Sequence, residues 1–273
     1  MLNPRRKKWS LPIIAMAAAV AWPAGTAMAA DVSGAGDEVN VRVDRAWQFI
    51  VAPYFVGANI TGTSQVGRLP NTDIDIGTGD ILENLHFGGM IYAEALYRER
   101  FGAFIDVAYM KLGSARDILA TGGRARVGVG QLIAETMLTY RLFKSANSHV
   151  DVYAGGRYWD ISLDLNVTGS IAGSFTTTRG DDWWDPVIGV RGSHDLTDKW
   201  SLNARADIGG FGIASDFTWN LQGGAGYRFN DIWSAHLQYK VLSVDYDNGR
   251  TGPSSFAYDT ITHGPVIGIA ATF

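Results

Sequence analysis

The chain has 273 residues, 33 glycines, no cysteine and a formal net charge of -4, and only 18% of its residues are charged. The lack of cysteine excludes disulfides, thiol nucleophiles and thiolate metal sites, and the lack of a basic run gives no electrostatic footprint for nucleic acid. This composition fits neither a disordered chain nor a helical membrane bundle, so we expect one folded domain.

The N-terminal thirty residues have the three parts of a secretory signal peptide. A basic head at residues 5–8 precedes an apolar stretch at 11–20, and the segment 27–29 (Ala-Met-Ala) supplies a small-x-small cleavage site. We therefore expect residues 1–29 to be removed and residues 30–273 to form the mature domain. An uncleaved anchor helix is the alternative, because the apolar stretch with its alanine-rich tail approaches the roughly 20 residues that a bilayer requires.

Beyond Asp31 no apolar run reaches the roughly 18 residues of a membrane helix, so any membrane contact there must come from strands. The chain instead alternates apolar and polar residues, which is the pattern of strands with two different faces. In chain order, we predict strands at 47–61, 86–98, 101–120, 124–142, 149–166, 183–196, 199–211, 216–229, 231–246 and 259–273.

The alternation is clearest in the segments that start at Trp200, Phe217 and Trp233. From Trp233 onwards one face carries Trp, Ala, Leu, Tyr and Val, and the other carries Ser, His, Gln and Lys. A barrel wall between lipid and lumen requires this alternation, so we predict an all-β fold: a single transmembrane antiparallel up-and-down β-barrel of about ten strands, within a range of roughly eight to twelve. A soluble β-sandwich or lipocalin-like barrel, with its apolar face turned inward, is the alternative.

The connections between the predicted strands alternate in length. Short turns follow Arg98, Lys144, Leu196 and Phe229, whereas the other connections are mostly longer, polar or glycine-rich. Outer-membrane barrels have short periplasmic turns and long outer loops, so an even strand number places both mature termini in the periplasm. The third and fourth strands, at roughly 3.3 Å per residue, outrun an apolar band of about 25 Å, and we expect this hairpin to protrude from the membrane.

Aromatic residues gather at the predicted strand ends. Amphipathic rings favour the headgroup level of a membrane, so these residues are candidates for two aromatic girdles. The candidates are Tyr97, Phe101, Trp184, Trp200, Trp219, Phe229, Trp233 and Tyr246.

The last residue, Phe273, closes an alternating strand and resembles the C-terminal signal that the outer-membrane assembly machinery recognises, although Ala271 stands where an aromatic residue is frequent. From the sixth predicted strand onwards, the sequence also resembles a widespread, mostly uncharacterised family of proteobacterial outer-membrane barrels. The motifs that carry this resemblance are Trp184-Asp185-Pro186, Asp207-Ile208-Gly209-Gly210-Phe211-Gly212, Gly226-Tyr227-Arg228-Phe229 and Val244-Asp245-Tyr246. The resemblance implies barrel architecture and an outer-membrane location, and it carries over no catalytic residue.

The predicted registers turn many ionisable side chains of both signs into the barrel lumen. Because an unpaired buried charge costs several kcal/mol, we expect these groups to pair with one another. They are Glu94, Asp106, Glu135, Arg141, Asp151, Arg157, Asp185, Arg191, Arg205, Asp207, Arg228, His236 and Lys240. A wide water channel needs roughly sixteen strands, so we favour a polar plug, with an ion-conducting path as the alternative.

Two further sets of residues could carry chemistry. Loop carboxylates offer oxygen ligands to a hard cation, but none forms a known calcium motif, and we expect no metal site and no cofactor. A rim site could form from Ser254, Ser255, Asp259 and His263, with His86 nearby. No strained elbow or oxyanion motif accompanies these serines. We therefore expect no enzyme, and a rim-located lipid-modifying or proteolytic enzyme is the alternative.

These observations predict an integral outer-membrane protein of a Gram-negative cell, with a structural or surface-interaction role. A narrow channel for ions or small solutes is the first alternative to that role. We expect outer-membrane lipid and lipopolysaccharide around the barrel, the barrel-assembly machinery as the partner during biogenesis, no nucleic acid, and a monomer.

Overall fold

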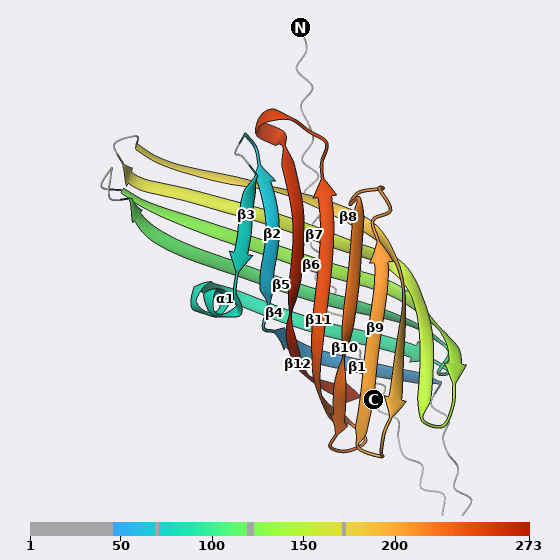
Figure 1. Cartoon of the computed structure of the whole chain (residues 1–273). Helices are drawn as coiled ribbons and strands as arrows, with labels where there is room; N and C mark the ends of the chain where they lie inside the picture. The colour runs from blue at the N-terminus through green and yellow to red at the C-terminus, as the bar shows by residue number, and fades with distance from the viewer. Residues whose placement is uncertain (1–45, 69–70, 119–122, 171–172) are drawn as a thin grey trace, which may run out of the picture. The chain divides into compact units, whose positions relative to one another are not determined.

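The computed structural model describes residues 46–68, 71–118, 123–170 and 173–273. The predicted signal peptide, residues 1–29, lies outside them. Ten antiparallel strands form a closed barrel, in which the last strand pairs back onto the first (Figure 1). The predicted ten-stranded antiparallel barrel is therefore confirmed.

Sequential strands are neighbours around the barrel. The barrel strands are β1 (Trp47–Val56), β4 (Leu85–Tyr97), β5 (Phe101–Ile118), β6 (Gly123–Lys144), β7 (Ser148–Ser170), β8 (Gly173–Asp195), β9 (Trp200–Gly209), β10 (Phe217–Arg228), β11 (Trp233–Asp247) and β12 (Phe256–Thr272). A hairpin of two further strands adds to the edge of β12. The remaining elements are β2 (Asn59–Val66), β3 (Thr72–Ile76), the helix α1 (Thr78–Asn84) and the 3-10 turn η1 (Gly252–Ser254).

Large apolar side chains cover the outer surface of the barrel wall. Leu237 on β11 and Ile267 on β12 lie opposite each other, and they are 60% and 59% exposed. The next pair along these strands, Gln238 and Val266, faces the interior instead. An apolar face turned outward is what a bilayer requires, so the soluble-barrel alternative, with its apolar face inward, is wrong.

The first barrel strand is interrupted, so the prediction of one continuous strand over 47–61 is wrong. The C-terminal half of β12, residues 266–272, pairs with β1, and the N-terminal half, residues 256–263, pairs with β2. At the interruption two backbones come very close, since a Cβ built on Gly264 would lie 2.0 Å from the carbonyl oxygen of Gly57. Only glycine allows such an approach, so the contact between β12 and the interruption depends on Gly264.

We expect Gly264→Ala to destabilise the barrel, because the added methyl group would have to displace the backbone of Gly57. Overpacking of this kind costs about 1–3 kcal/mol, and urea unfolding followed by the loss of the compact band on unboiled gels measures it. Gly79→Ala in α1 is the control, since a Cβ there meets nothing within 4 Å and should change stability by less than about 1 kcal/mol. Equal stability of the two variants would contradict the close approach.

The acidic segment after the first predicted strand is structured, although no strand or helix was predicted there. β3 pairs with β2, and α1 follows β3. The hydroxyl of Thr78 lies 2.9 Å and 3.0 Å from the carbonyl oxygens of Gly57 and Ala58, so the start of α1 is fixed to the interruption between β1 and β2. Five strand residues and a seven-residue helix give too little periodicity to recognise. Within the described residues, no helix is long and apolar enough to cross a membrane.

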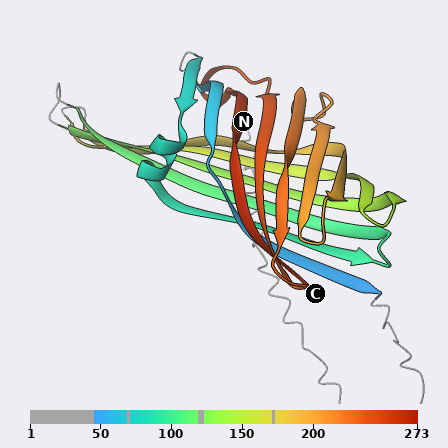
Figure 2. The ribbon, with the colours of Figure 1, turned by 60° about the horizontal axis from the view of Figure 1, so that its bottom comes forward.

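Strands β5 to β8 extend past their neighbours as one long sheet (Figure 2). The predicted start of the sixth strand at residue 183 is wrong, because β8 already begins at Gly173. β9 pairs with β8 only as far as Val187, so the outer part of β8 has no partner strand on that side within the described residues. The unusual length predicted for the third and fourth strands is therefore shared by β7 and β8, and their protrusion from a membrane stays a prediction.

Candidate functional site: a charged interior closed by two layers

A buried arginine crosses the middle of the barrel interior. Arg157 on β7 is 0% exposed, and its guanidinium donates hydrogen bonds to Glu135 on β6 (2.8 Å) and to Asp207 on β9 (2.7 Å). A third hydrogen bond, of 3.2 Å, reaches the hydroxyl of Thr218 on β10. Since three strands separate β6 from β10 in the sheet, this one side chain joins distant parts of the wall through the lumen.

Arg205 on β9 extends the same network. Its guanidinium donates to Glu135 and to the hydroxyl of Tyr153, the latter over 2.8 Å. Asp106 on β5 lies 3.8 Å from Arg205 and accepts a 2.6 Å hydrogen bond from the hydroxyl of Tyr54. The buried carboxylates are thus held by charged and neutral donors together, which offsets the cost of removing them from water.

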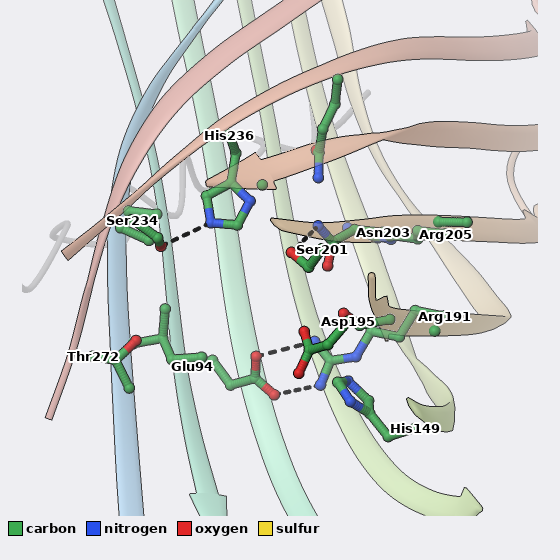
Figure 3. Close-up of a pocket in the computed structure, with 18 of the residues that line it drawn as sticks. Glu94, His149, Arg191, Asp195, Ser201, Asn203, Arg205, Ser234, His236 and Thr272 are labelled. Atoms are coloured by element: carbon green, nitrogen blue, oxygen red, sulfur yellow. Dashed lines mark hydrogen bonds and ion pairs between the residues drawn. The ribbon is translucent and has the colours of Figure 1, made fainter. Parts of the chain in front are cut away.

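A second ion cluster lies nearer the short turns. Arg191 on β8 donates to Glu94 on β4 and to Asp151 on β7 (3.0 Å), and Arg141 on β6 donates to Asp151 over 2.7 Å. Figure 3 shows Glu94 and Arg191 pointing toward each other from different parts of the wall. Because β4 and β8 are separated by three strands, this pair also bridges the lumen.

The two clusters together are balanced in charge. Lys240 lies close enough to Asp106 and Glu135 for an electrostatic interaction with both. Five cationic side chains therefore face five carboxylates, namely Arg141, Arg157, Arg191, Arg205 and Lys240 against Glu94, Asp106, Glu135, Asp151 and Asp207. A network without surplus charge offers no field that would draw ions of one sign through it.

An aromatic layer lies between this network and the outer end of the barrel. Trp183 on β8 stacks on Tyr246 on β11, with ring centroids 3.7 Å apart, and on Trp159 on β7 at 5.8 Å. The same buried cluster contains Ile161, Leu242, Val244, Phe256 and Tyr258. The prediction that Tyr246 belongs to the girdle is therefore wrong: on β11 it shares the inward parity of His236 and Lys240.

Asp185 fastens the β9–β10 loop to the aromatic layer. Its carboxylate is buried and accepts hydrogen bonds from the indole of Trp159 (2.9 Å) and from the hydroxyl (2.7 Å) and backbone N–H (2.9 Å) of Ser215. Asp185 was expected in an ion-pair network, but its hydrogen-bond donors among the described residues are neutral. Its role is to hold the base of the loop at Ser215, next to Ala214, which packs against the aromatic layer.

A cavity of about 630 Å³ lies between the ion clusters and the short-turn end (Figure 3). His236, which pairs with the hydroxyl of Ser234 at 3.0 Å, lines this cavity. Arg228 lines it as well but is exposed, and it lies 3.8 Å from Asp195. None of the aromatic-layer residues lines the cavity. The cavity therefore ends at the ion network.

The other predicted girdle residues lie on the outer surface of the wall. At the short-turn end, the rings of Trp200 and Tyr227 pack edge to face, with centroids 4.9 Å apart. The residues with outward or exposed rings are Tyr97, Phe101, Trp184, Trp200, Trp219, Phe229 and Trp233. Their contact with lipid headgroups stays a prediction.

The candidate hydrolytic residues do not form a catalytic arrangement. His263 lies on the outer face of β12, where its Nδ1 is 2.7 Å from the hydroxyl of Tyr239. Ser254 ends η1 and Ser255 follows it, and within the described chain no hydrogen bond joins either serine hydroxyl to His263. The side chain of His86 lies outside the described residues.

Acidic residues near the outer end are engaged locally. Asp181 accepts a 2.7 Å hydrogen bond from Asn248. Burial, followed by the carboxylates of Asp259 and Asp216, raises the pKa of Asp245 above its ordinary value at the outer end of β11. In the part of the chain that the structure describes, no group of three acidic, histidine or cysteine side chains could hold a metal ion.

No protein-family model and no curated protein matches the chain, so the resemblance to an uncharacterised outer-membrane family stays a prediction. Among solved structures, the chain is similar to the outer-membrane protease OmpT of Escherichia coli, at 10% identity and a TM-score of 0.48, over 85% of this chain and 98% of that one. The translocator domain of the autotransporter NalP of Neisseria meningitidis matches at 15% identity and a TM-score of 0.43, over 83% and 88%. Ail, the attachment invasion locus protein of Yersinia pestis, matches at 9% identity and a TM-score of 0.34, over 83% and 98%.

Reasoning from the sequence missed the aromatic part of the interior. Tyr54 and Tyr153 hydrogen-bond to the buried carboxylates, and Trp159 and Trp183 form the layer above them. A signal for two of these residues was available, because Tyr153 and Trp159 share the strand parity of the inward-facing Arg157. Parity places a ring in the lumen even where its size and hydrophobicity suggest the membrane surface.

Proposed function

We propose that the protein is an outer-membrane barrel with a closed lumen, whose role is structural or in binding at the cell surface. The observation that carries this proposal is the closure of the interior at two levels. Arg157 with its carboxylates forms one level, and the stack of Trp183 on Tyr246 forms the other. A solute would have to displace both, and the side chains of Arg157, Trp183 and Tyr246 are buried.

The length of β6 to β8 supports a role outside the membrane. These strands have 22 to 23 residues, whereas a tilted strand crosses the hydrocarbon core with about 9–11. About half of each strand is therefore available for an extracellular extension. In this proposal both mature termini are periplasmic, residues 1–29 are removed as a signal, and the partners are outer-membrane lipid, lipopolysaccharide and, during biogenesis, the assembly machinery.

We also propose that the protein has no enzymatic activity and that it is a monomer. His263 supports the first point, because its ring pairs with Tyr239 on the outward face and contacts no serine hydroxyl among the described residues. The balanced interior network supports the second, since it needs no residue from another chain to complete its ion pairs.

In planar lipid bilayers, the purified protein should give no stable unitary current steps, because the ion network and the aromatic layer obstruct the lumen. Single-channel recording measures this directly. A compact band on unboiled gels, shifted by boiling, ensures that the recorded sample is folded. Reproducible steps of one size from such a sample would contradict the closed lumen and favour the narrow channel.

A further inference from the structure

The β9–β10 loop carries exposed apolar side chains. Its residues 210–216 read Gly-Phe-Gly-Ile-Ala-Ser-Asp, and the side chains of Phe211 and Ile213 are 47% and 74% exposed. Phe211 has a φ of 53° and stands between two glycines with φ of 82° and 68°. This left-handed turn is uncommon for a bulky residue, and it presents both apolar side chains at the surface.

Hydrogen bonds fix the loop at its base. The N–H of Gly210 donates to the carbonyl of Pro186 (3.1 Å), and the N–H of Gly212 donates to the carbonyl of Ser215 (3.0 Å). Ser215 is itself held by Asp185 through two hydrogen bonds. A loop tied down at both ends keeps Phe211 and Ile213 exposed in the folded protein, so this exposure needs an explanation.

The loop lies at the end of the short strand β9, beside the longer strand β8. β9 ends at Gly209, which pairs with Val187 on β8 and Thr218 on β10, whereas β8 continues outward. Two outward aromatic side chains flank this position, Trp184 on β8 and Phe217 on β10, and they are 54% and 45% exposed. On the side of β8 and β9 the loop therefore adjoins the apolar outer face of the wall, where Ile188 and Ile208 are exposed, whereas on the other side the residue opposite Phe217 is Asp245 on β11.

The β11–β12 connection shows the opposite composition. Residues 248–255 read Asn-Gly-Arg-Thr-Gly-Pro-Ser-Ser and contain no large apolar side chain. A loop surrounded by water is expected to look like this, whereas a contiguous exposed apolar patch marks an interaction site. Because the exposed side chains of the β9–β10 loop adjoin the apolar outer face of β8 and β9, lipid is the partner that fits them.

We propose that Phe211 and Ile213 insert into the outer leaflet and anchor the β8–β10 side of the barrel at the membrane interface. This inference rests on the membrane location proposed above. An aromatic ring at this depth suits the headgroup region, and the aliphatic side chain suits the acyl chains beneath it. Since Asp185 and Pro186 hold the base of the loop, the anchor is rigid and sets the depth of this side of the wall.

Spin labels test the anchor, and the lack of cysteine in the chain allows one label at a time. A nitroxide is attached to Ile213→Cys, to Leu221→Cys on the lipid-facing wall and to Thr251→Cys in the polar connection. Each variant is reconstituted in phosphatidylcholine vesicles, and the compact band on unboiled gels checks its folding. Electron paramagnetic resonance then measures collisions with oxygen, which concentrates in lipid, and with a water-soluble nickel chelate.

We expect the Ile213 label to resemble the Leu221 label, with oxygen accessibility high and nickel accessibility several-fold below that at Thr251. Nickel accessibility at Ile213 equal to that at Thr251 would overturn the anchor, while a lipid-exposed Leu221 label in the same series would leave the membrane location intact. A water-exposed Leu221 label would refute the membrane location itself. Phe211→Cys replaces Ile213→Cys if the latter does not fold.

Discussion

Replacement of Arg157 by methionine should lower the free energy of unfolding by about 3–5 kcal/mol, the usual cost of removing one partner of a buried ion pair. The variant leaves the carboxylates of Glu135 and Asp207 inside the barrel without one of the two cations that they share. Arg205 still contacts both, so the variant should fold. Urea unfolding in lipid vesicles, read as the ratio of compact to unfolded bands, measures the change.

Two further variants make this prediction specific. Arg250→Met removes an exposed arginine from the β11–β12 connection and should change stability by no more than about 0.5 kcal/mol. Adding Glu135→Gln to Arg157→Met should recover part of the loss, because it removes one of the negative charges that Arg157 had neutralised, and the two changes are coupled. An Arg157→Met barrel as stable as the Arg250→Met barrel would show that the buried network contributes nothing.

Trp183→Ala should also cost about 3–5 kcal/mol, as large-to-small changes of buried aromatic residues do. The change removes the ring that lies between Tyr246 and Trp159, and it removes the indole N–H that donates to Ser215 (2.8 Å). The aromatic layer would be left with a void at its centre. The same urea experiment measures the loss.

The adjacent residue supplies the control for Trp183. Trp184→Ala deletes a side chain of the same size from the outward face of the same strand, where its main ring contact is Tyr158 at 5.1 Å. Such a pair contributes about 0.5–1.5 kcal/mol beyond its area, so this variant should be the more stable of the two. The reverse order would mean that the interior stack does not support the barrel.

Alternation predicted the strands that lie within the membrane. β9, β10 and β11 begin and end within two residues of the predicted ranges 199–211, 216–229 and 231–246, because over most of their length each has an apolar outer face and a polar inner face. The same parity argument turned Arg157, Arg205 and the other charges inward, and it said that they must pair. It did not say which charges would pair, since the partners lie on strands that are not neighbours.

The wrong predictions lie where the apolar residues of a strand move from its outward face to its inward face. On β11 the outward residues are apolar as far as Val241 and polar from Ser243 onwards, whereas the inward residues become apolar from Leu242. Alternation with a period of two continues across this reversal, so it does not reveal where the membrane ends. Tyr246 was assigned to the outer girdle for this reason, and the apolar interior of the extension went unrecognised.

The change of partner along β12 also bears on how the chain reaches its folded state. The last strand of the sequence must meet β1, β2 and β11 at once, and one of its contacts, between Asn59 and His263, spans 204 positions. Contacts of such long range raise the contact order and slow folding. Until β12 docks, these three strands carry unpaired edges that invite aggregation. Closure of the barrel is therefore the pairing of longest range in the chain, and three strand edges depend on it.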